Sequence, residues 1–582
     1  MRRIGIDLGT TNTCMYCASF PPVVEGEARD YFSLNPIKIF YENQGDMINP
    51  EIDSKMPSAI YARRKKDGKT EEEYDFFLGK IAVISAKQDG AVEMINTKRL
   101  MCNEDADKVV KYGLTAQAIA QKLLEGCRYS ILKDSDIGER RLKLSTQCIT
   151  QPAAFGLFAS RSIHDAGKAA GFSNAEVQRE PIAALLSYLY QELDDQNKAE
   201  KLLERQRIKG DKLLTLVVDI GGGTTDVTIQ EINISGSANH KQGSLFCTGY
   251  TIKFMNLVSE DNGPAAAANQ NPAFGGYEFD KRIASHIIDE WDKQYYKEKN
   301  EHLNSNDIEF KKKIEHLFQR VQDYKNSLST NPTTRSDTVI INGVTITTQW
   351  SPEKLYEWTR PLCISPDDQE ENTQTIYGII ADTIKRSGYN VKDIDCFFVT
   401  GGMSSYKVVR EVINEKFGSI VEDGVLSYSE NPLYDIARGA AVCNCYFEVK
   451  MPDSVLYADL MIDDPCGEPY VLVKKNTPLP IPSKTIENFL TLRNPVYFHV
   501  DVLWGNGPKD CKLQKLRRLR KPVPSSNGHG KVTKIGTLIS VEYEIDAHQA
   551  VNITLIVHDP QGEYRVPLLH LIENIDLTTK GD

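Results

Sequence analysis

The most constraining feature of the sequence is a glycine-rich stretch between two apolar runs, VVDIGGGTTDVTI at residues 217–229. Residues 213–218 form an apolar run that predicts a buried strand, and the roughly alternating apolar residues after the glycines predict a second strand. The glycines therefore lie at a hairpin tip, where residues without Cβ let backbone N–H groups converge on an anion. A purely structural hairpin would not need the flanking Asp219, Asp226 and paired threonines.

Two common phosphate-binding motifs do not fit this stretch. A Walker A loop requires Gly-Lys-Ser/Thr after the glycines, and that sequence is absent here. A Rossmann turn requires a helix at the point where this chain continues as a strand. The stretch is therefore a different kind of phosphate-binding turn.

The same pattern stands at the N-terminus, where residues 4–12 read IGIDLGTTN. Both copies run apolar–Asp–apolar–Gly–Thr–Thr–polar, and about two hundred residues separate them. One copy alone would be a weak signal, but two copies with matched Asp and Thr positions indicate an internally duplicated fold. Each half would then contribute one hairpin that grips a phosphate chain.

Composition and charge exclude several broad classes of protein. The 582 residues are enough for two to four domains, and a net charge of −11 argues against a general nucleic-acid binder. No apolar run approaches the length of a bilayer span, and Arg2-Arg3 leads directly into the first expected strand. We therefore expect neither a signal peptide nor a membrane anchor. The twelve scattered cysteines are typical of a reducing compartment, so we expect a cytoplasmic protein.

Two short cysteine motifs do not predict a metal site. Cys14 and Cys17 form a CxxC, but they fall on an expected strand, where positions i and i+3 face opposite sides. Cys443 and Cys445 form a CxC. Because no partner pair stands at zinc-finger spacing, we interpret all four as core cysteines.

Three further stretches carry groups that chemistry could use. Glu180 and a proline open an apolar helix over 182–193, where the glutamate either serves the helix dipole or points at a metal-bound nucleotide. Lys98 lies beside an arginine, which alone favours a surface position. Gly401 and Gly402 stand between an expected strand and a helix, which allows close backbone approach to a ligand.

With these residues assembled, the first three-quarters of the chain resembles the nucleotide-binding domain of the seventy-kilodalton heat-shock chaperone family, in the actin and sugar-kinase ATPase superfamily. The resemblance rests on IDLGTTN, NTKRL, the Pro152 segment, REPIAAL, VVDIGGGTTDV, FGGYEFD, VTGGMSS and NP…ARGAA, all in family order. The resemblance implies an α/β fold. Residues 1–448 would form a duplicated actin-like (ribonuclease-H-like) domain in two lobes. A linker over 449–455 and an all-β sandwich over 456–582 would follow.

The resemblance also implies ATP or ADP and Mg²⁺ as cofactors, and it assigns roles to individual residues. Lys98 matches the family's catalytic lysine and Glu180 the carboxylate facing it, with Thr224 beside the phosphates. Asp7 and Asp219 would hold Mg²⁺ through its water shell, since this ion prefers to keep its waters. Further nucleotide contacts are implied for a larger set: Gly9, Thr10, Thr11, Asn12, Gly221, Gly222, Gly223, Thr225, Asp226, Gly276, Lys325, Ser329, Gly401, Gly402 and Met403.

The chain departs from the family pattern on the adenosine side of the expected site. Asn326 stands where the family has an arginine, and Gln322 where it has a glutamate. Ser405 replaces an arginine shortly after Gly401 and Gly402, and Ser160 replaces an arginine used in interdomain signalling. Because a guanidinium stacks on a base in a way that an amide cannot, we expect weaker or less selective adenosine binding.

The C-terminal part resembles the family's substrate-binding β-sandwich more faintly. Residues 470–480 fit its early strand and turn, and residues 541–546 and 551–557 fit its late hairpin. The last two alternate cleanly, which by itself predicts half-buried antiparallel strands. The basic run 512–521 could attract acidic partners, but a charged strand and loop is the favoured interpretation.

Two family features are missing from the sequence. The linker position is polar and contains Pro452, which cannot donate to a sheet edge. About twenty-five residues follow the last expected strand, which is too few for a long helical lid. We therefore expect a divergent, lidless member.

The favoured hypothesis is an ATP-dependent chaperone-like protein that hydrolyses ATP slowly and holds extended or unfolded polypeptide in its sandwich. A J-domain co-chaperone and a nucleotide exchange factor are the further partners that the resemblance implies, with no nucleic acid and no membrane. One alternative is a low-turnover, nucleotide-dependent interaction module with a dedicated partner, which the adenosine-side departures favour. A second alternative is a small-molecule kinase of the same superfamily, against which the sandwich and the Lys98–Glu180 pair argue.

Overall fold

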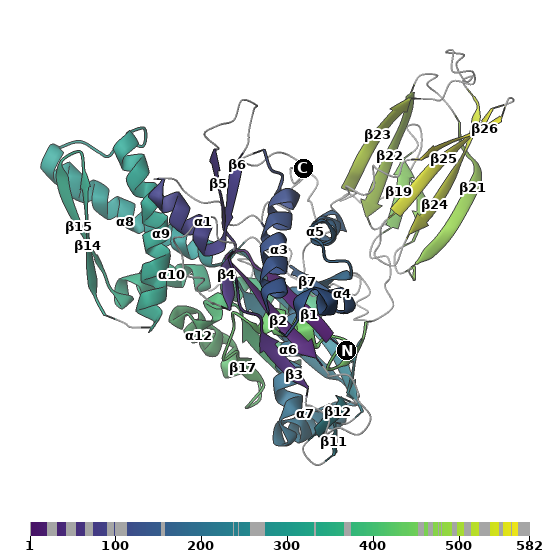
Figure 1. Ribbon diagram of the computed structural model, residues 1–582, viewed down its shortest axis with the longest axis horizontal. Helices are drawn as coiled ribbons and strands as arrows, with labels where there is room; N and C mark the ends of the chain where they lie inside the picture. The colour runs from purple at the N-terminus through teal and green to yellow at the C-terminus, as the bar shows by residue number, and fades with distance from the viewer. Residues whose placement is uncertain are drawn as a thin grey trace.

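The computed structural model describes most of the chain in segments: residues 2–19, 32–41, 54–64, 74–89, 98, 113–134, 136–152, 157–236, 238–241, 244–248, 250–255, 274–330, 333–365, 374–451, 459–463, 469–474, 477–478, 480–491, 497–505, 514–522, 536–545, 551–559 and 562–567. At some of these positions, mostly in the C-terminal strands, only the course of the backbone is described. Figure 1 shows the first three-quarters of the chain as helices and sheets, with the C-terminal strands in two layers of their own.

The first lobe is built on a mixed sheet in the order β3-β2-β1-β7-β8, with β4 also paired to β2. The strands β1 and β2 form an antiparallel hairpin, whereas β1, β7 and β8 run parallel to one another. The bounds are β1 (Arg2–Leu8), β2 (Asn12–Ser19), β3 (Ser33–Pro36), β4 (Lys55–Pro57), β7 (Thr146–Gln151) and β8 (Ala175–Arg179).

The second lobe repeats this topology in the order β17-β16-β9-β10-β13, to which β18 adds a sixth strand. Here β9 and β10 form the antiparallel hairpin, and β16 and β17 continue parallel to β9. The bounds are β9 (Leu213–Ile220), β10 (Thr225–Ser235), β13 (Thr251–Phe254), β16 (Cys396–Thr400), β17 (Leu426–Tyr428) and β18 (Glu448–Lys450). The duplication predicted from the two glycine motifs is confirmed at the level of strand order and direction.

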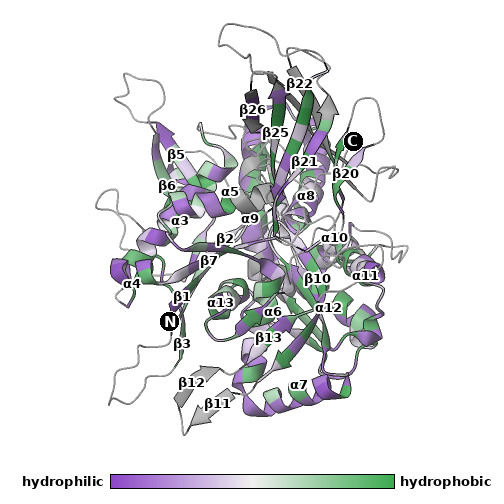
Figure 2. Ribbon diagram, turned by 90° about the vertical axis from the view of Figure 1, so that its right-hand side faces the viewer, coloured by the Kyte–Doolittle hydropathy of each residue, from purple (hydrophilic) through white to green (hydrophobic). Residues whose placement is uncertain are grey.

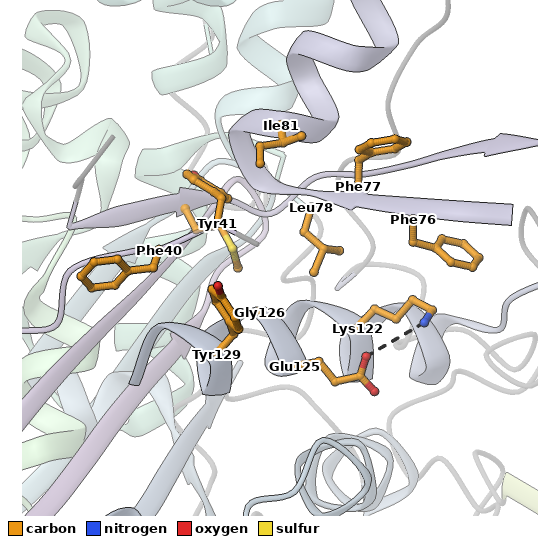
Figure 3. Close-up of a pocket in the computed structure, with 11 residues that line it drawn as sticks. Phe40, Tyr41, Phe76, Phe77, Leu78, Ile81, Lys122, Glu125, Gly126 and Tyr129 are labelled. Atoms are coloured by element: carbon orange, nitrogen blue, oxygen red, sulfur yellow. Dashed lines mark ion pairs between the residues drawn. The ribbon is translucent and has the colours of Figure 1, made fainter. Parts of the chain in front are cut away.

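Helices and a small hairpin cover the first lobe. Ile119, Leu123 and Cys127 lie four residues apart on α3 and are fully buried, as expected for one face of a helix that packs against a core. A cavity of about 200 Å³ lies between α3, α1 and β6, lined mainly by aromatic and aliphatic side chains (Figure 3). The elements are β5 (Ile60–Arg64), β6 (Tyr74–Leu78), α1 (Gly79–Gln88), α3 (Ala116–Lys133), α4 (Gly138–Leu144) and α5 (Leu157–Ala169).

The second lobe carries a helical layer and a long hairpin. The core between α8, α9, α10 and the hairpin β14–β15 is centred on two buried tryptophans, Trp291 and Trp350. Its elements are α8 (Gly276–Lys299), α9 (Ile308–Thr330), β14 (Arg335–Ile341), β15 (Val344–Trp350), α10 (Pro352–Cys363), α11 (Ile376–Ser387) and α12 (Lys407–Ile413). A second small hairpin pairs β11 (Ala238–Lys241) with β12 (Ser244–Thr248).

The polar segment between the lobes is a helix, α7 (Gln196–Ile208), and Figure 2 shows it as largely hydrophilic. Leu202 is on the buried face of α7, and the amide of Gln206 both donates to the Ile234 carbonyl and accepts from the Ile234 N–H. Because these bonds complete the pairing of a strand backbone, α7 is anchored to the sheet despite its polar composition.

Two helices cross between the lobes with their backbones in direct contact. The crossing pairs α6 (Glu180–Asp194) with α13 (Asp435–Val442), and α13 also packs on β1. A side chain at Gly439 would collide with the carbonyl of Ala183, and one at Gly5 would collide with the carbonyl of Ala437. Small residues are therefore required on both contacts.

The C-terminal residues form two four-stranded antiparallel sheets, β20-β19-β22-β23 and β21-β24-β25-β26. The predicted late hairpin is confirmed, with Ile545 opposite Val551, and the basic run lies largely in the edge strand β23. One expectation was wrong, because β26 follows the strand that we took to be the last. The bounds are β19 (Asp459–Asp463), β20 (Tyr470–Val473), β21 (Ile481–Thr491), β22 (Tyr497–Gly505), β23 (Gln514–Pro522), β24 (Leu538–Ile545), β25 (Val551–Asp559) and β26 (Gly562–Pro567).

The start of the predicted linker is part of a sheet. Val449 and Lys450 belong to β18, where they pair in parallel with Ile252 and Lys253 of β13. Met451 follows and is exposed, and residues 452–458, which include Pro452, lie outside the described residues. The residues after 567, where the sequence predicts no lid, also lie outside them.

None of the helices in the segments that the structure describes has the length and apolar character that a membrane crossing requires. The cysteines of the CxxC and CxC motifs are free thiols, and Cys14, Cys443 and Cys445 are buried. These positions agree with the interpretation of core cysteines.

The glycine contact between α6 and α13 leads to a stability prediction. Gly439→Ala would place a methyl group against the backbone of Ala183, which cannot move without displacing α6. We expect a loss of about 1–3 kcal/mol in the free energy of unfolding, measured by chemical denaturation. Gly418→Ala is the matched control, because a Cβ there meets only ordinary contacts at 3.6 Å and beyond. An unchanged stability in Gly439→Ala would contradict the close crossing.

Candidate functional site

The two hairpin tips place matching acidic residues next to matching glycine turns. In the first hairpin, Asp7 lies opposite Cys14, one pair below the turn that contains Gly9 to Asn12. In the second, Asp219 lies directly opposite Asp226, just below the turn of Gly221 to Thr224. Each turn follows an interior strand of its sheet, β1 or β9, in which most residues are buried.

The two tips meet each other. A side chain at Gly222 would collide with the hydroxyl of Thr11, so the backbone of one turn lies against a side chain of the other. The second turn is closed by the Gly221 N–H, which donates to the Thr224 carbonyl at 2.8 Å. Thr10 and Thr224 are both buried, whereas Thr11 is exposed. The geometry brings together the predicted phosphate-contacting residues of both copies.

The N-terminus of α8 is fastened to the second turn. The Gly276 N–H donates to the Gly221 carbonyl at 3.0 Å, and the Tyr277 N–H donates to the Gly222 carbonyl at 2.6 Å. A Cβ at Gly275 would lie 2.8 Å from the backbone nitrogen of Thr224, so this approach requires glycine. The first amides of a helix usually lack intrahelical partners, and here the hairpin supplies them.

Lys98 and Glu180 form a buried ion pair. The Lys98 Nζ donates to the Glu180 Oε1, and the two side chains are only 4% and 5% exposed. Glu180 is the first residue of α6, with Pro181 behind it in the first turn, so the helix presents this carboxylate at its N-terminus. Lys98 is therefore a buried, paired lysine and not the surface lysine that its sequence neighbours favoured.

The acidic groups of the site interact strongly because they share a poorly solvated region. Desolvation raises the pKa of the Asp7 carboxyl to about 7, with the charge of Lys98 opposing this shift and that of Glu180 adding to it. Burial, together with the charges of Glu180, Asp226 and Asp7, raises the pKa of Asp219 well above its usual value. Burial alone would lower the pKa of Lys98, but the charges of Glu180 and Asp7 outweigh it and raise that pKa. In the part of the chain that the structure describes, one lysine therefore faces four carboxylates, and the cluster favours an added cation.

Thr150 also belongs to this cluster, although no motif in the sequence predicted it. Thr150 is fully buried on β7, and its hydroxyl donates to the Asp7 Oδ1 at 3.3 Å. The contact follows from the parallel register that places Ile149 beside Ile6. The adjacent Gln151 has a buried amide oxygen that no described group satisfies. The only signal in the sequence was the Pro152 segment, which directly follows β7.

Gly401 and Gly402 form a third glycine turn, which belongs to the second lobe and borders the site. Gly401 has a φ of +83°, a backbone conformation that favours glycine, and a side chain there would collide with the Asp219 carboxylate. Met403 is buried, and a Cβ at Gly276 would lie 3.2 Å from its sulfur. The predicted contacts Gly401, Gly402 and Met403 therefore lie beside both the second hairpin and the start of α8.

The remaining predicted contacts lie on α9. Lys325 is buried, and its Nζ donates to the Asp280 Oδ1 at 2.7 Å and to the Gly276 carbonyl at 3.4 Å. Gln322 also donates to Asp280, at 3.3 Å. Ser329 and Asn326 lie on the same helix, but their side chains are outside the described residues, as is that of Ser160 on α5.

The residues present fit a hydrated magnesium ion. Carboxylate oxygens are the ligands that Mg²⁺ prefers, and the ion usually keeps several waters that hydrogen-bond to nearby acceptors. The described residues contain no group of three or more His, Cys, Asp or Glu side chains placed to bind a metal directly. A site in which Asp7 and Asp219 hold the ion through water needs no such group, and the excess negative charge supplies the attraction.

A comparison with known protein families agrees with the motif order. The family model described as Hsp70 protein matches residues 90–241 and 261–553. The match spans more than half of the 582 residues and extends from the nucleotide-binding lobes into the C-terminal sheets. The duplicated lobes, the meeting of the two hairpin tips and this match lead to one conclusion: the chain belongs to the Hsp70 family.

Proposed function

We propose that this chain is a chaperone-like ATPase that binds and slowly hydrolyses ATP and holds extended polypeptide in its C-terminal sandwich. Proteins of the Hsp70 family are ATPases with a general ATP-dependent chaperone function, and they bind ATP or ADP with Mg²⁺. The observation that carries the proposal is the convergence of both hairpin tips on a cluster in which Lys98 is paired with Glu180. Turnover of ATP against GTP, with and without unfolded peptides, tests it.

The residues of the cluster divide the work of phosphoryl transfer to water. The glycine turns offer backbone N–H groups for the phosphates, and Thr10, Thr11 and Thr224 surround that position with hydroxyls. Mg²⁺, when bound through Asp7 and Asp219, would neutralise charge on the phosphates. Glu180 holds the Lys98 ammonium in one orientation, so its charge is already in place when negative charge develops.

The C-terminal strands supply the second half of the proposal. Each of the two antiparallel sheets ends in edge strands, and an edge strand can bind an extended segment by strand-type contacts. J-domain co-chaperones and exchange factors are the partners typical of the family, and we include them as candidate partners of this chain.

One observation favours a second candidate, a nucleotide-dependent interaction module with little turnover. Gln322, on the adenosine side of the expected site, donates its amide to Asp280 of the protein itself. Adenosine would then find fewer polar partners in this site. A steady-state rate indistinguishable from that of a protein with Lys98 removed would favour this candidate.

We expect Asp219→Asn and Asp7→Asn to weaken magnesium-dependent nucleotide binding, because each removes one anchor of the hydrated ion. Titration of ATP by calorimetry, with Mg²⁺ and with EDTA, measures the effect. Asp289→Asn changes an exposed carboxylate of α8 and is the control. The cleft assignment is wrong if both site variants keep the wild-type affinity for magnesium–ATP.

We expect Lys98→Ala to reduce ATP hydrolysis by roughly 10²-fold or more, with a much smaller effect on ATP binding. A positive charge directed at the developing negative charge acts mainly in the transition state. The variant should therefore show a large loss in single-turnover rate and a small loss in the ATP affinity measured by titration. Lys407→Ala, which removes a lysine that is 80% exposed, should change neither quantity. An equal loss in binding and rate would make Lys98 a simple phosphate clamp.

We expect ATP to change the dissociation rate of a bound peptide by less than about tenfold. The segment that leaves the second lobe is polar and buries little apolar surface, so two nucleotide states differ little in the free energy of its docking. Stopped-flow release of a fluorescent peptide, in ATP and in ADP, measures the change. A hundredfold difference would show that the two parts of the chain are coupled through other contacts.

A further inference from the structure

A buried ion pair joins α8 to α9 at the edge of the proposed nucleotide site. Asp280 is 2% exposed, and its Oδ1 accepts from the Lys325 Nζ at 2.7 Å. Lys325 is 7% exposed. A buried charge is stable only when its partner is well placed, so this pair holds both side chains in one arrangement.

The helix α9 holds both oxygens of Asp280. The amide of Gln322 donates to the Oδ2 at 3.3 Å, three residues before Lys325 and thus on the same face of α9. The Lys325 Nζ also reaches the Gly276 carbonyl at 3.4 Å. Asp280 and Gly276 are four residues apart on α8, so the lysine spans one full turn of that helix.

The same turn of α8 is bound to the phosphate-side hairpin. The N–H groups of Gly276 and Tyr277 donate to the carbonyls of Gly221 and Gly222. Hydrogen bonds therefore run without interruption from the second glycine turn, through the first turn of α8, to Lys325 on α9. The position of the Lys325 ammonium relative to the phosphates is fixed by this path and by Asp280.

We propose that Asp280 is a positioning residue for the nucleoside part of the ligand, acting through Lys325. This inference rests on the proposed function, because it takes the two hairpin tips as the phosphate end of the site. The Lys325 ammonium and the start of α8 then form a rigid wall on the nucleoside side, beside Met403. Without the Asp280 charge, Lys325 loses the partner that fixes it, and whole nucleotides bind less well.

A purely structural role for the pair would give a different result. If Asp280 only joined two helices, its loss would lower stability and weaken every ligand of the site alike. If it positions Lys325 for the nucleoside, its loss weakens ATP and ADP but spares an inorganic chain of three phosphates, which has no nucleoside. Magnesium tripolyphosphate is therefore the informative probe.

The experiment measures dissociation constants of ATP, ADP and tripolyphosphate, each with Mg²⁺, for the full chain and for Asp280→Asn, Lys325→Met and the double variant. We expect each single change to weaken ATP and ADP by roughly tenfold and tripolyphosphate by less than about threefold. Because Asp280 acts through Lys325, the double variant should bind ATP no more weakly than the weaker single variant.

Two further variants keep the test decisive. Gln322→Met leaves the ion pair in place and should give a smaller loss in the same direction, even if Asp280→Asn fails to fold. Glu278→Gln removes the acid of a more exposed α8 pair with Lys281 and should leave all three constants unchanged.

Three results would each overturn the inference. The affinity losses of the two single variants could multiply in the double variant, tripolyphosphate could lose as much affinity as ATP, or ATP could lose none. The effect of Asp219→Asn on ATP affinity tests the proposed function separately. If that variant weakens ATP while Asp280→Asn and Gln322→Met do not, only the inference about Asp280 fails. If neither Asp219→Asn nor Asp280→Asn changes ATP binding, the proposed site itself is wrong.

Discussion

The close crossing of α13 with α6 and β1 is the constraint on which the rest of the nucleotide-binding lobes depend. At Gly439 and Gly5 the backbones approach so closely that no side chain fits, and glycine and alanine therefore occupy the contact. This contact helps to set the distance between the lobes, because α13 packs on the sheet of the first lobe and α6 packs on strands of both sheets. The two glycine turns come from different lobes, so the meeting of Thr11 with Gly222 is possible only at this separation.

Among the described residues, the site that results carries more negative than positive charge. Asp7, Glu180, Asp219 and Asp226 act on one another through a poorly solvated region, and Lys98 is the cation that opposes them there. Desolvated carboxylates become costly to ionise unless a positive charge is supplied. A divalent cation brought with a nucleotide supplies it, whereas a neutral metabolite would not. The charge of the cluster therefore favours a magnesium-bound phosphate ligand, which an ATPase and a kinase of the superfamily would both bind.

Sequence reasoning succeeded where a local pattern was repeated and failed where contacts depend on the register of distant segments. The two hairpins were predictable because each combines apolar runs with glycines and a flanking aspartate, and the duplication followed from their repetition. Lys98 could not be separated from a surface lysine by its neighbours, because its burial depends on Glu180, 82 positions away. Thr150 was missed because its contact with Asp7 arises from parallel pairing across 143 positions. The expected linker began as a strand because its pairing with β13 needs only free backbone groups, which the polar side chains of that segment do not reveal.

A buried polar network connects the site to the end of the nucleotide-binding lobes. The Thr400 hydroxyl, directly before the third glycine turn, donates to the Asp435 Oδ2 at 2.5 Å, and Ser187 and Arg438 engage the other oxygen. Both oxygens of a fully buried carboxylate are thus satisfied, and such a network restricts geometry more than it adds stability. It ties β16 and α6 to the first turns of α13, and six residues after α13 the chain enters β18 beside β13. A displacement of the third glycine turn must therefore either break this network or move α13 with it. Breaking the Thr400 bond would leave one oxygen of a buried carboxylate without its donor, although Arg438 still pairs with the other oxygen. Moving α13 would disturb its close backbone contacts with α6 and β1. The network and these contacts therefore both hold the third glycine turn in one position relative to α6.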